Sequence, residues 1–99
     1  EGLLAAVASL GDRLAAGLEA TDDPWVAGQR GAGLWRALLL TEPVAVEVER
    51  VARSRGFLVN AVRPDTIRIC PPLTITSVEI DQFLAALPGI LRATREDLT

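Results

Sequence analysis

Arg68 is the residue of this sequence whose type and surroundings best suit binding chemistry. It lies between Ile67 and Ile69, so the alternation of a strand would turn it away from the two isoleucines and from the core. Its planar guanidinium could bind a carboxylate through two parallel hydrogen bonds. The rigid Pro71-Pro72 step just beyond would help to fix the end of that strand. An arginine in such a place is more often simply solvated, so the pattern leaves both interpretations open.

Several side chains that carry catalysis are missing from the chain. All ten basic residues are arginine, and without lysine or histidine there is no Schiff-base amine, no imidazole base and no histidine metal ligand. Cys70 is the single cysteine, so it can form no internal disulfide and belongs to no zinc-binding cluster. We expect Cys70 to be a small apolar strand residue, and the cysteine usage to fit a reducing, cytoplasmic setting.

Other polar and aromatic residues are weaker candidates. Asn60 could project toward a ligand, although an asparagine near a turn more often caps backbone groups. Trp25 and Trp35 could stack on a planar ligand, but we expect them in the core or in an interface. The segment 31–33, Gly-Ala-Gly, resembles part of a phosphate loop, yet it precedes an apolar run and does not open a helix. We therefore reject a phosphate site there.

Length and composition predict one small domain, residues 1–99, that packs against something else. The chain is 49% hydrophobic, which exceeds the need of a domain this small and suggests a surface normally covered. Its net charge of -3 gives no support to a nucleic-acid or polybasic membrane role. No apolar run approaches the roughly 18 residues of a membrane span, and no signal peptide is recognisable. Because the chain opens at Glu1 inside a helical pattern, we expect a piece of a longer protein.

The first half of the chain predicts helix, strand and helix. Apolar residues at helical spacing indicate a helix over residues 2–20, and the Thr-Asp-Asp-Pro segment 21–24 indicates a turn. The apolar run 34–40 suggests a central strand covered on both faces. Thr41 or Glu42 near a cap and Pro43 in the first turn predict a helix through about Arg55, stopped by Gly56. The alternation of the valines in 44–48 would instead fit a strand. The stripe of the first helix is Leu3, Val7, Leu10, Leu14 and Leu18.

The second half predicts a hairpin followed by a helix. Segments 57–62 and 66–70 have the composition of strands and are joined by the turn residues 63–65. Thr76 and Glu79 form a capping-box pattern at the start of a helix that Pro88 should kink or interrupt. The order α-β-α-β-β-α describes an α/β (α+β) fold. It is a small two-layer sandwich whose mostly antiparallel sheet has about three strands, with helices on one face.

Two segments resemble a known family. Residues 56–60 (Gly-Phe-Leu-Val-Asn) and 67–76 (Ile-Arg-Ile-Cys-Pro-Pro-Leu-Thr-Ile-Thr) resemble the C-terminal small domain of acetylornithine aminotransferases, which are class III, fold type I enzymes dependent on pyridoxal phosphate. Residues 30–34 resemble the glycine-containing entry to that domain's first strand. Departures from the family are Cys70, commonly Ala, and Ala37 and Leu39, commonly Gly and Glu.

The resemblance implies a homodimeric enzyme of arginine biosynthesis that moves the δ-amino group of N-acetylornithine to 2-oxoglutarate. It gives Arg68 the task of binding the α-carboxylate of 2-oxoglutarate or glutamate. The resemblance places the catalytic residues and the pyridoxal phosphate site in a large domain, so this chain alone, without lysine, should be inactive. Ornithine, succinylornithine and 4-aminobutyrate aminotransferases share much of the pattern. A stand-alone, non-catalytic α/β binding module remains the alternative of a different class.

Overall fold

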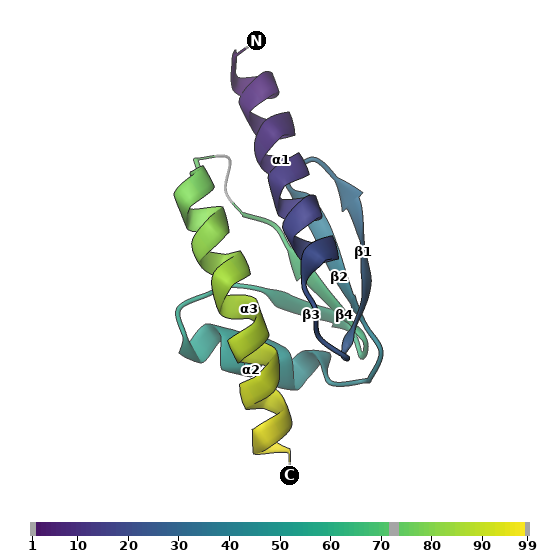
Figure 1. Ribbon diagram of the computed structural model, residues 1–99. Helices are drawn as coiled ribbons and strands as arrows, with labels where there is room; N and C mark the ends of the chain where they lie inside the picture. The colour runs from purple at the N-terminus through teal and green to yellow at the C-terminus, as the bar shows by residue number, and fades with distance from the viewer. Residues whose placement is uncertain (1, 72–73, 99) are drawn as a thin grey trace.

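The computed structural model describes residues 2–71 and 74–98, and it places three helices and four strands in that part of the chain (Figure 1). The elements are α1 (Gly2–Ala20), β1 (Val26–Ala32), β2 (Trp35–Leu40), α2 (Ala45–Ser54), β3 (Asn60–Arg63), β4 (Thr66–Ile69) and α3 (Ser77–Asp97). The strands form one antiparallel sheet in the order β1-β2-β4-β3. The two-layer α+β fold class is therefore confirmed.

The sheet has one strand more than the sequence patterns indicated. β1 pairs with β2 from Val26 to Ala32, with a register shift between Val26 and Gly28, and this pair lies beside the hairpin of β3 and β4. Two glycines, Gly28 and Gly31, dilute the strand signal of β1, and its exposed edge position supplies no apolar alternation. A Cβ at Gly31 would collide with the backbone of Trp35, so the close approach of β1 to β2 depends on this glycine.

The predicted start of α3 is confirmed, whereas that of α2 is wrong. At α3, the Thr76 hydroxyl accepts a hydrogen bond from the Glu79 backbone N–H, and the Glu79 carboxylate accepts one from the Thr76 N–H, which confirms the capping box. α2 begins at Ala45, after Pro43, so the predicted cap at Thr41 or Glu42 is wrong. The Thr41 hydroxyl instead donates to the Pro24 carbonyl oxygen.

Other boundaries also shifted. α3 continues through Pro88 without interruption. The first strand of the hairpin is shorter than predicted, since residues 57–59 lie outside β3. α2 ends at Ser54 with Arg55 as its C-cap, and Gly56, with φ of +89°, comes directly after Arg55 and confirms the predicted stop. Pro72, whose rigidity was expected to fix the end of β4, lies outside the described residues.

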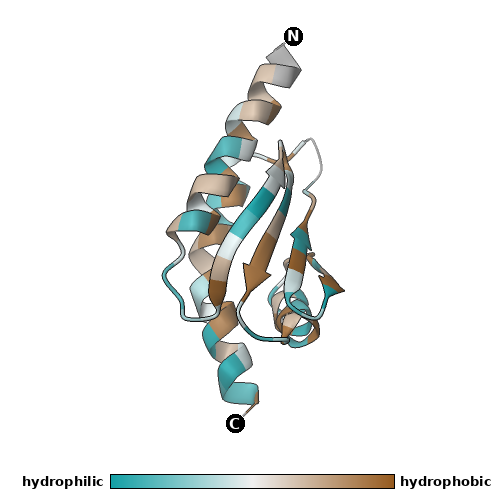
Figure 2. Cartoon of the chain, turned by 90° about the vertical axis from the view of Figure 1, so that its right-hand side faces the viewer, coloured by the Kyte–Doolittle hydropathy of each residue, from teal (hydrophilic) through white to brown (hydrophobic). Residues whose placement is uncertain are grey.

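The core lies between the sheet and the helices. α1 contacts β1 and β2, α2 contacts β3 and β4, and α3 packs against both other helices. Figure 2 shows the long helices α1 and α3 to one side of the strands. The apolar stripe of α1 is buried at Leu14 and Leu18, whereas the side chain of Leu3 lies outside the described part. Other fully buried members include Leu38, Val48, Ile67, Ile80, Ile90 and Leu91.

Candidate substrate-binding site

Arg68 points away from the core, as strand alternation predicted. Its neighbours along β4, Ile67 and Ile69, are only 2% and 6% exposed, whereas Arg68 itself is exposed. We call the side of the sheet to which Arg68 points, opposite to the two isoleucines, the outer face. The buried isoleucines hold the strand against the helices, so the direction of Arg68 is fixed by the packing of its neighbours.

The strand register places a defined set of residues beside Arg68. Its Cα partner on β2 is Ala37, and its partner on β3 is Asn60. Ala37 in turn pairs with Arg30 of β1. Residues directly opposite one another in a sheet project to the same face, so these four form one row across all four strands. The row presents two guanidinium groups and a carboxamide, and the alanine between the arginines has a side chain too short to cover them.

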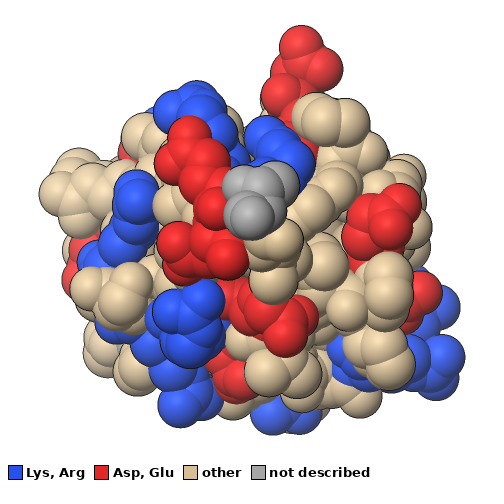
Figure 3. Space-filling model, turned by 90° about the horizontal axis from the view of Figure 1, so that it is seen from below, with Lys and Arg blue, Asp and Glu red and all other residues tan. Residues whose placement is uncertain are grey.

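The charge of the strands is one-sided. The four strands contain four arginines and no aspartate or glutamate. Arg36 donates to the carbonyl oxygens of Gly33 and Gly31 and so closes the turn between β1 and β2. Arg30, Arg63 and Arg68 form no hydrogen bond or ion pair with the described residues. By contrast, basic and acidic side chains lie next to one another at the end of the molecule seen in Figure 3.

This arrangement suits the binding of an anion at Arg68. An arginine that is paired with a protein carboxylate, as Arg13 is with Asp81, has already committed two of its N–H donors. Arg68 keeps all its donors, and no strand residue offers a competing negative charge. A planar carboxylate can therefore engage two parallel N–H groups at this position.

An apolar stripe along the outer face of β2 crosses this row at Ala37. Trp35, Ala37 and Leu39 alternate with inward residues, and Trp35 is 70% exposed. The prediction that this run is covered on both faces is therefore wrong for the described chain. Trp35 lies on the surface, so a core position is wrong and the interface interpretation stays a prediction, and Ala37 and Leu39 are half-buried.

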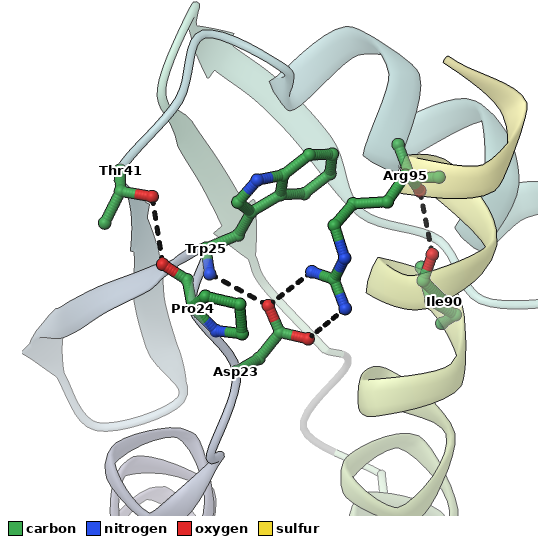
Figure 4. A network of polar contacts seen from close by, with 7 residues as sticks. Asp23, Pro24, Trp25, Thr41, Ile90 and Arg95 are labelled. Carbon is green, nitrogen blue, oxygen red and sulfur yellow. Dashed lines mark hydrogen bonds and ion pairs between the residues drawn. The ribbon is translucent and has the colours of Figure 1, made fainter. Parts of the chain in front are cut away.

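The start of β1 is held by a polar network with the last turn of α3 (Figure 4). Arg95 of α3 donates to both carboxylate oxygens of Asp23, at 2.7 and 3.0 Å, and lies over the Trp25 ring, 5.0 Å from its centroid. The Trp25 backbone N–H also donates to Asp23. Burial of Asp23 opposes ionisation, but the hydrogen bonds and the charges of Arg95 and Arg92 outweigh it and lower the pKa of Asp23.

The other candidate residues from the sequence, Trp25, Cys70 and the segment 31–33, are not part of the row that contains Arg68. Trp25 stacks with Arg95 and so is structural. Cys70 is exposed and lies just beyond β4, so its expected place as an apolar strand residue is wrong. It lines an apolar pocket of about 440 Å³ with Phe57, Ile75 and Phe83, in which Arg68 takes no part. The segment 31–33 ends β1 and begins the turn to β2 and opens no helix, in agreement with rejection of a phosphate loop.

Sequence reasoning did not find the row itself. Arg30 entered only as part of a glycine-containing segment, and the capping role favoured for Asn60 is wrong, because its side chain forms no hydrogen bond with the described residues. The register of three strand pairs brings these residues together. The alternation within a single strand shows which face a residue is on, but not which residue of the next strand lies opposite it.

Two other site types find no support in the part of the chain that the structure describes. Over residues 2–71 and 74–98, no group of three or more His, Cys, Asp or Glu side chains could hold a metal ion. None of the described helices has the length and apolar character needed to cross a membrane.

A solved structure shows a class of protein in which this fold occurs. A lysine aminotransferase from Mycobacterium tuberculosis superposes with a TM-score of 0.85 and 34% sequence identity, over 94% of this chain and 22% of that one. The fold is thus one found within aminotransferases. No protein-family model matches the chain.

Curated relatives narrow the comparison to acetylornithine aminotransferases. The Mycobacterium leprae enzyme is 45% identical over 98 residues, which is 99% of this chain and 24% of the relative. The Streptomyces coelicolor enzyme is also 45% identical, over 97% of this chain and 24% of its own length. The resemblance to acetylornithine aminotransferases is therefore confirmed across nearly the whole chain, which spans about a quarter of the length of these relatives.

Proposed function

We propose that this chain is the C-terminal small domain of a cytoplasmic, homodimeric aminotransferase of arginine biosynthesis. The enzyme would move the δ-amino group of N-acetylornithine to 2-oxoglutarate, and this domain would contribute Arg68 to bind the α-carboxylate of 2-oxoglutarate or glutamate. The observation that carries the proposal is the unpaired guanidinium of Arg68, held by two buried isoleucines on an outer face whose strands bear no acid. The names of the curated relatives supply the reaction.

The proposed cofactor, pyridoxal phosphate, would be held by the rest of the polypeptide. The chain has no lysine for its covalent attachment, and the unpaired arginines of the strands, Arg30, Arg63 and Arg68, do not belong to a glycine-rich loop that opens a helix. The residues of this chain do not fit the cofactor, so their proposed part is restricted to the substrate carboxylate and to contacts with the rest of the enzyme and its second subunit.

A second candidate is another class III aminotransferase with a different amino donor. The structural match to a lysine aminotransferase favours it, because 34% identity is shared with an enzyme named for a different amino donor. Both candidates assign the same task to Arg68, since ornithine, succinylornithine and 4-aminobutyrate enzymes would also use a 2-oxo acid acceptor. A stand-alone binding module is less well supported, because its outer face should be mainly polar and here carries Trp35, Ala37 and Leu39.

Half-reaction kinetics of the complete polypeptide that contains this segment test the assignment. Arg68→Ala should lower kcat/KM for 2-oxoglutarate by roughly 10- to 150-fold, the equivalent of about 1.5 to 3 kcal/mol, and leave the N-acetylornithine half-reaction much less affected. Arg68→Lys should restore only part of the loss, because an ammonium keeps the charge without the planar fork. Equal losses in the two half-reactions, together with a lower melting temperature, would show a purely structural arginine.

A further inference from the structure

Asn60 is a polar strand residue without a structural task in the described chain. Its side chain is half-buried at the first position of β3. It forms no hydrogen bond with the described residues, although an asparagine near a turn commonly bonds to the backbone. Its backbone is in register with Arg68, so the two side chains leave the sheet together on the outer face. Directly opposed residues have Cβ atoms about 4.5 to 5.5 Å apart.

The chemistry of a carboxylate leaves room for a second donor beside an arginine. Its two oxygens offer about four lone-pair sites, and a bidentate guanidinium occupies two of them. A carboxamide carries two N–H donors and no charge, so it can satisfy a remaining site without attracting Arg68 away from the ligand.

The other neighbours of Arg68 cannot supply this donor. Ala37, on its other side, has no polar side-chain atom, and Arg30 lies one strand further away. Thr66, two residues earlier on β4, is buried and donates its hydroxyl to Asp65. Asn60 is therefore the residue directly opposite Arg68 that has uncommitted N–H groups within the described sheet.

We propose that Asn60 is a second substrate-binding residue, which donates its carboxamide N–H to the same carboxylate that Arg68 binds. The ligand class is a 2-oxo or 2-amino acid. This inference rests on the proposed function of Arg68 and adds a neighbour to it. The neutral carboxamide also keeps the guanidinium available, since an acidic residue at position 60 would pair with Arg68 and compete with the substrate.

The test uses the complete polypeptide containing this segment, loaded with its cofactor, and follows each half-reaction separately. Asn60→Ala should lower kcat/KM for 2-oxoglutarate about tenfold, mainly through KM, with the N-acetylornithine half-reaction and the melting temperature unchanged. Asn60→Asp should lose more than Asn60→Ala, because its charge occupies Arg68. Gln82→Ala, which removes an exposed carboxamide from α3 and not from the sheet, is the matched control and should change neither half-reaction.

A double-mutant cycle decides whether the two residues share one carboxylate. In the Arg68→Ala background, Asn60→Ala should cost much less than it does alone, since the carboxylate is no longer held beside it. Two outcomes overturn the role of Asn60 and leave that of Arg68 standing. One is that the losses in kcat/KM for 2-oxoglutarate are fully additive in the double variant. The other is that Asn60→Ala loses nothing although Arg68→Ala is impaired. If Arg68→Ala leaves the acceptor half-reaction intact, the proposed function itself fails. Equal damage by Asn60→Ala to both half-reactions, with a lowered melting temperature, assigns Asn60 to the fold and also overturns the inference.

Discussion

Asp23 and Arg95 lie 72 positions apart in the sequence and form a two-point ion pair. The Asp23 side chain is only 5% exposed, and that of Arg95 is 30% exposed. The pair joins the segment before β1 to the last turn of α3, so it holds the edge strand β1 beside the last turn of that helix.

Removal of this pair should destabilise the chain in a pH-dependent way. Asp23→Asn should lower the free energy of unfolding at pH 7 by about 1.5 to 3 kcal/mol, since charge-assisted hydrogen bonds are lost. The pKa of Asp23 is lowered in the folded state, so its contribution is complete above the unfolded value near 4 and is lost as pH falls through the folded value. Urea unfolding at pH 7 and at pH 3 should therefore show a smaller difference between the two proteins in acid. A difference that is constant over this range would contradict the ion-pair account.

Gly11 of α1 should resist replacement although it lies inside a helix. An added Cβ would collide with the carbonyl oxygen of Gly33 in the turn between β1 and β2. Gly11→Ala gains helix propensity of up to about 1 kcal/mol, but the displacement of packed backbone should cost about 1 to 3 kcal/mol and give a net loss.

Gly89 of α3 supplies the control for this substitution. A Cβ there meets only the end of the Arg55 side chain, at 3.4 Å, so Gly89→Ala should be neutral or stabilising. Chemical denaturation of both variants measures the contrast. If Gly11→Ala were as stable as Gly89→Ala, the contact between α1 and the turn would not be tight.

The difference between predicted and observed structure follows from how local each signal is. The capping box at Thr76 and the apolar alternation around Arg68 involve a few consecutive residues, and both predicted the structure correctly. β1 is stabilised by pairing with β2, and its own glycine-containing sequence does not predict a strand. The pairing of Asn60 with Arg68 depends on hairpin register, which also shifts between Ala61 and Arg63. A one-residue slip in register would turn every side chain of the strand to the other face. The sequence alone therefore did not predict that Asn60 lies opposite Arg68.

The chain by itself should show no transaminase activity. It has no lysine to attach pyridoxal phosphate, so the covalent chemistry of the proposed enzyme must come from the rest of the polypeptide. Incubation with pyridoxal phosphate, N-acetylornithine and 2-oxoglutarate should yield glutamate at the rate of a protein-free control. Turnover above that rate, which survives blocking of the terminal amine, would contradict the assignment of catalysis to another domain.

Trp35 should promote self-association of the separate chain. Its indole is 70% exposed at one end of the apolar stripe of β2, and burial of so large a side chain gives a strong driving force. Trp35→Ser should weaken association roughly 30-fold, as expected for loss of about 2 kcal/mol from an aromatic contact. Val46→Ser is the control, because Val46 is 61% exposed on α2 and lies outside this stripe. Sedimentation over a concentration series should show association of the original chain and of Val46→Ser, with Trp35→Ser shifted toward monomer. A monomeric original chain, or an equal shift for both variants, would mean that the outer face is not the associating surface.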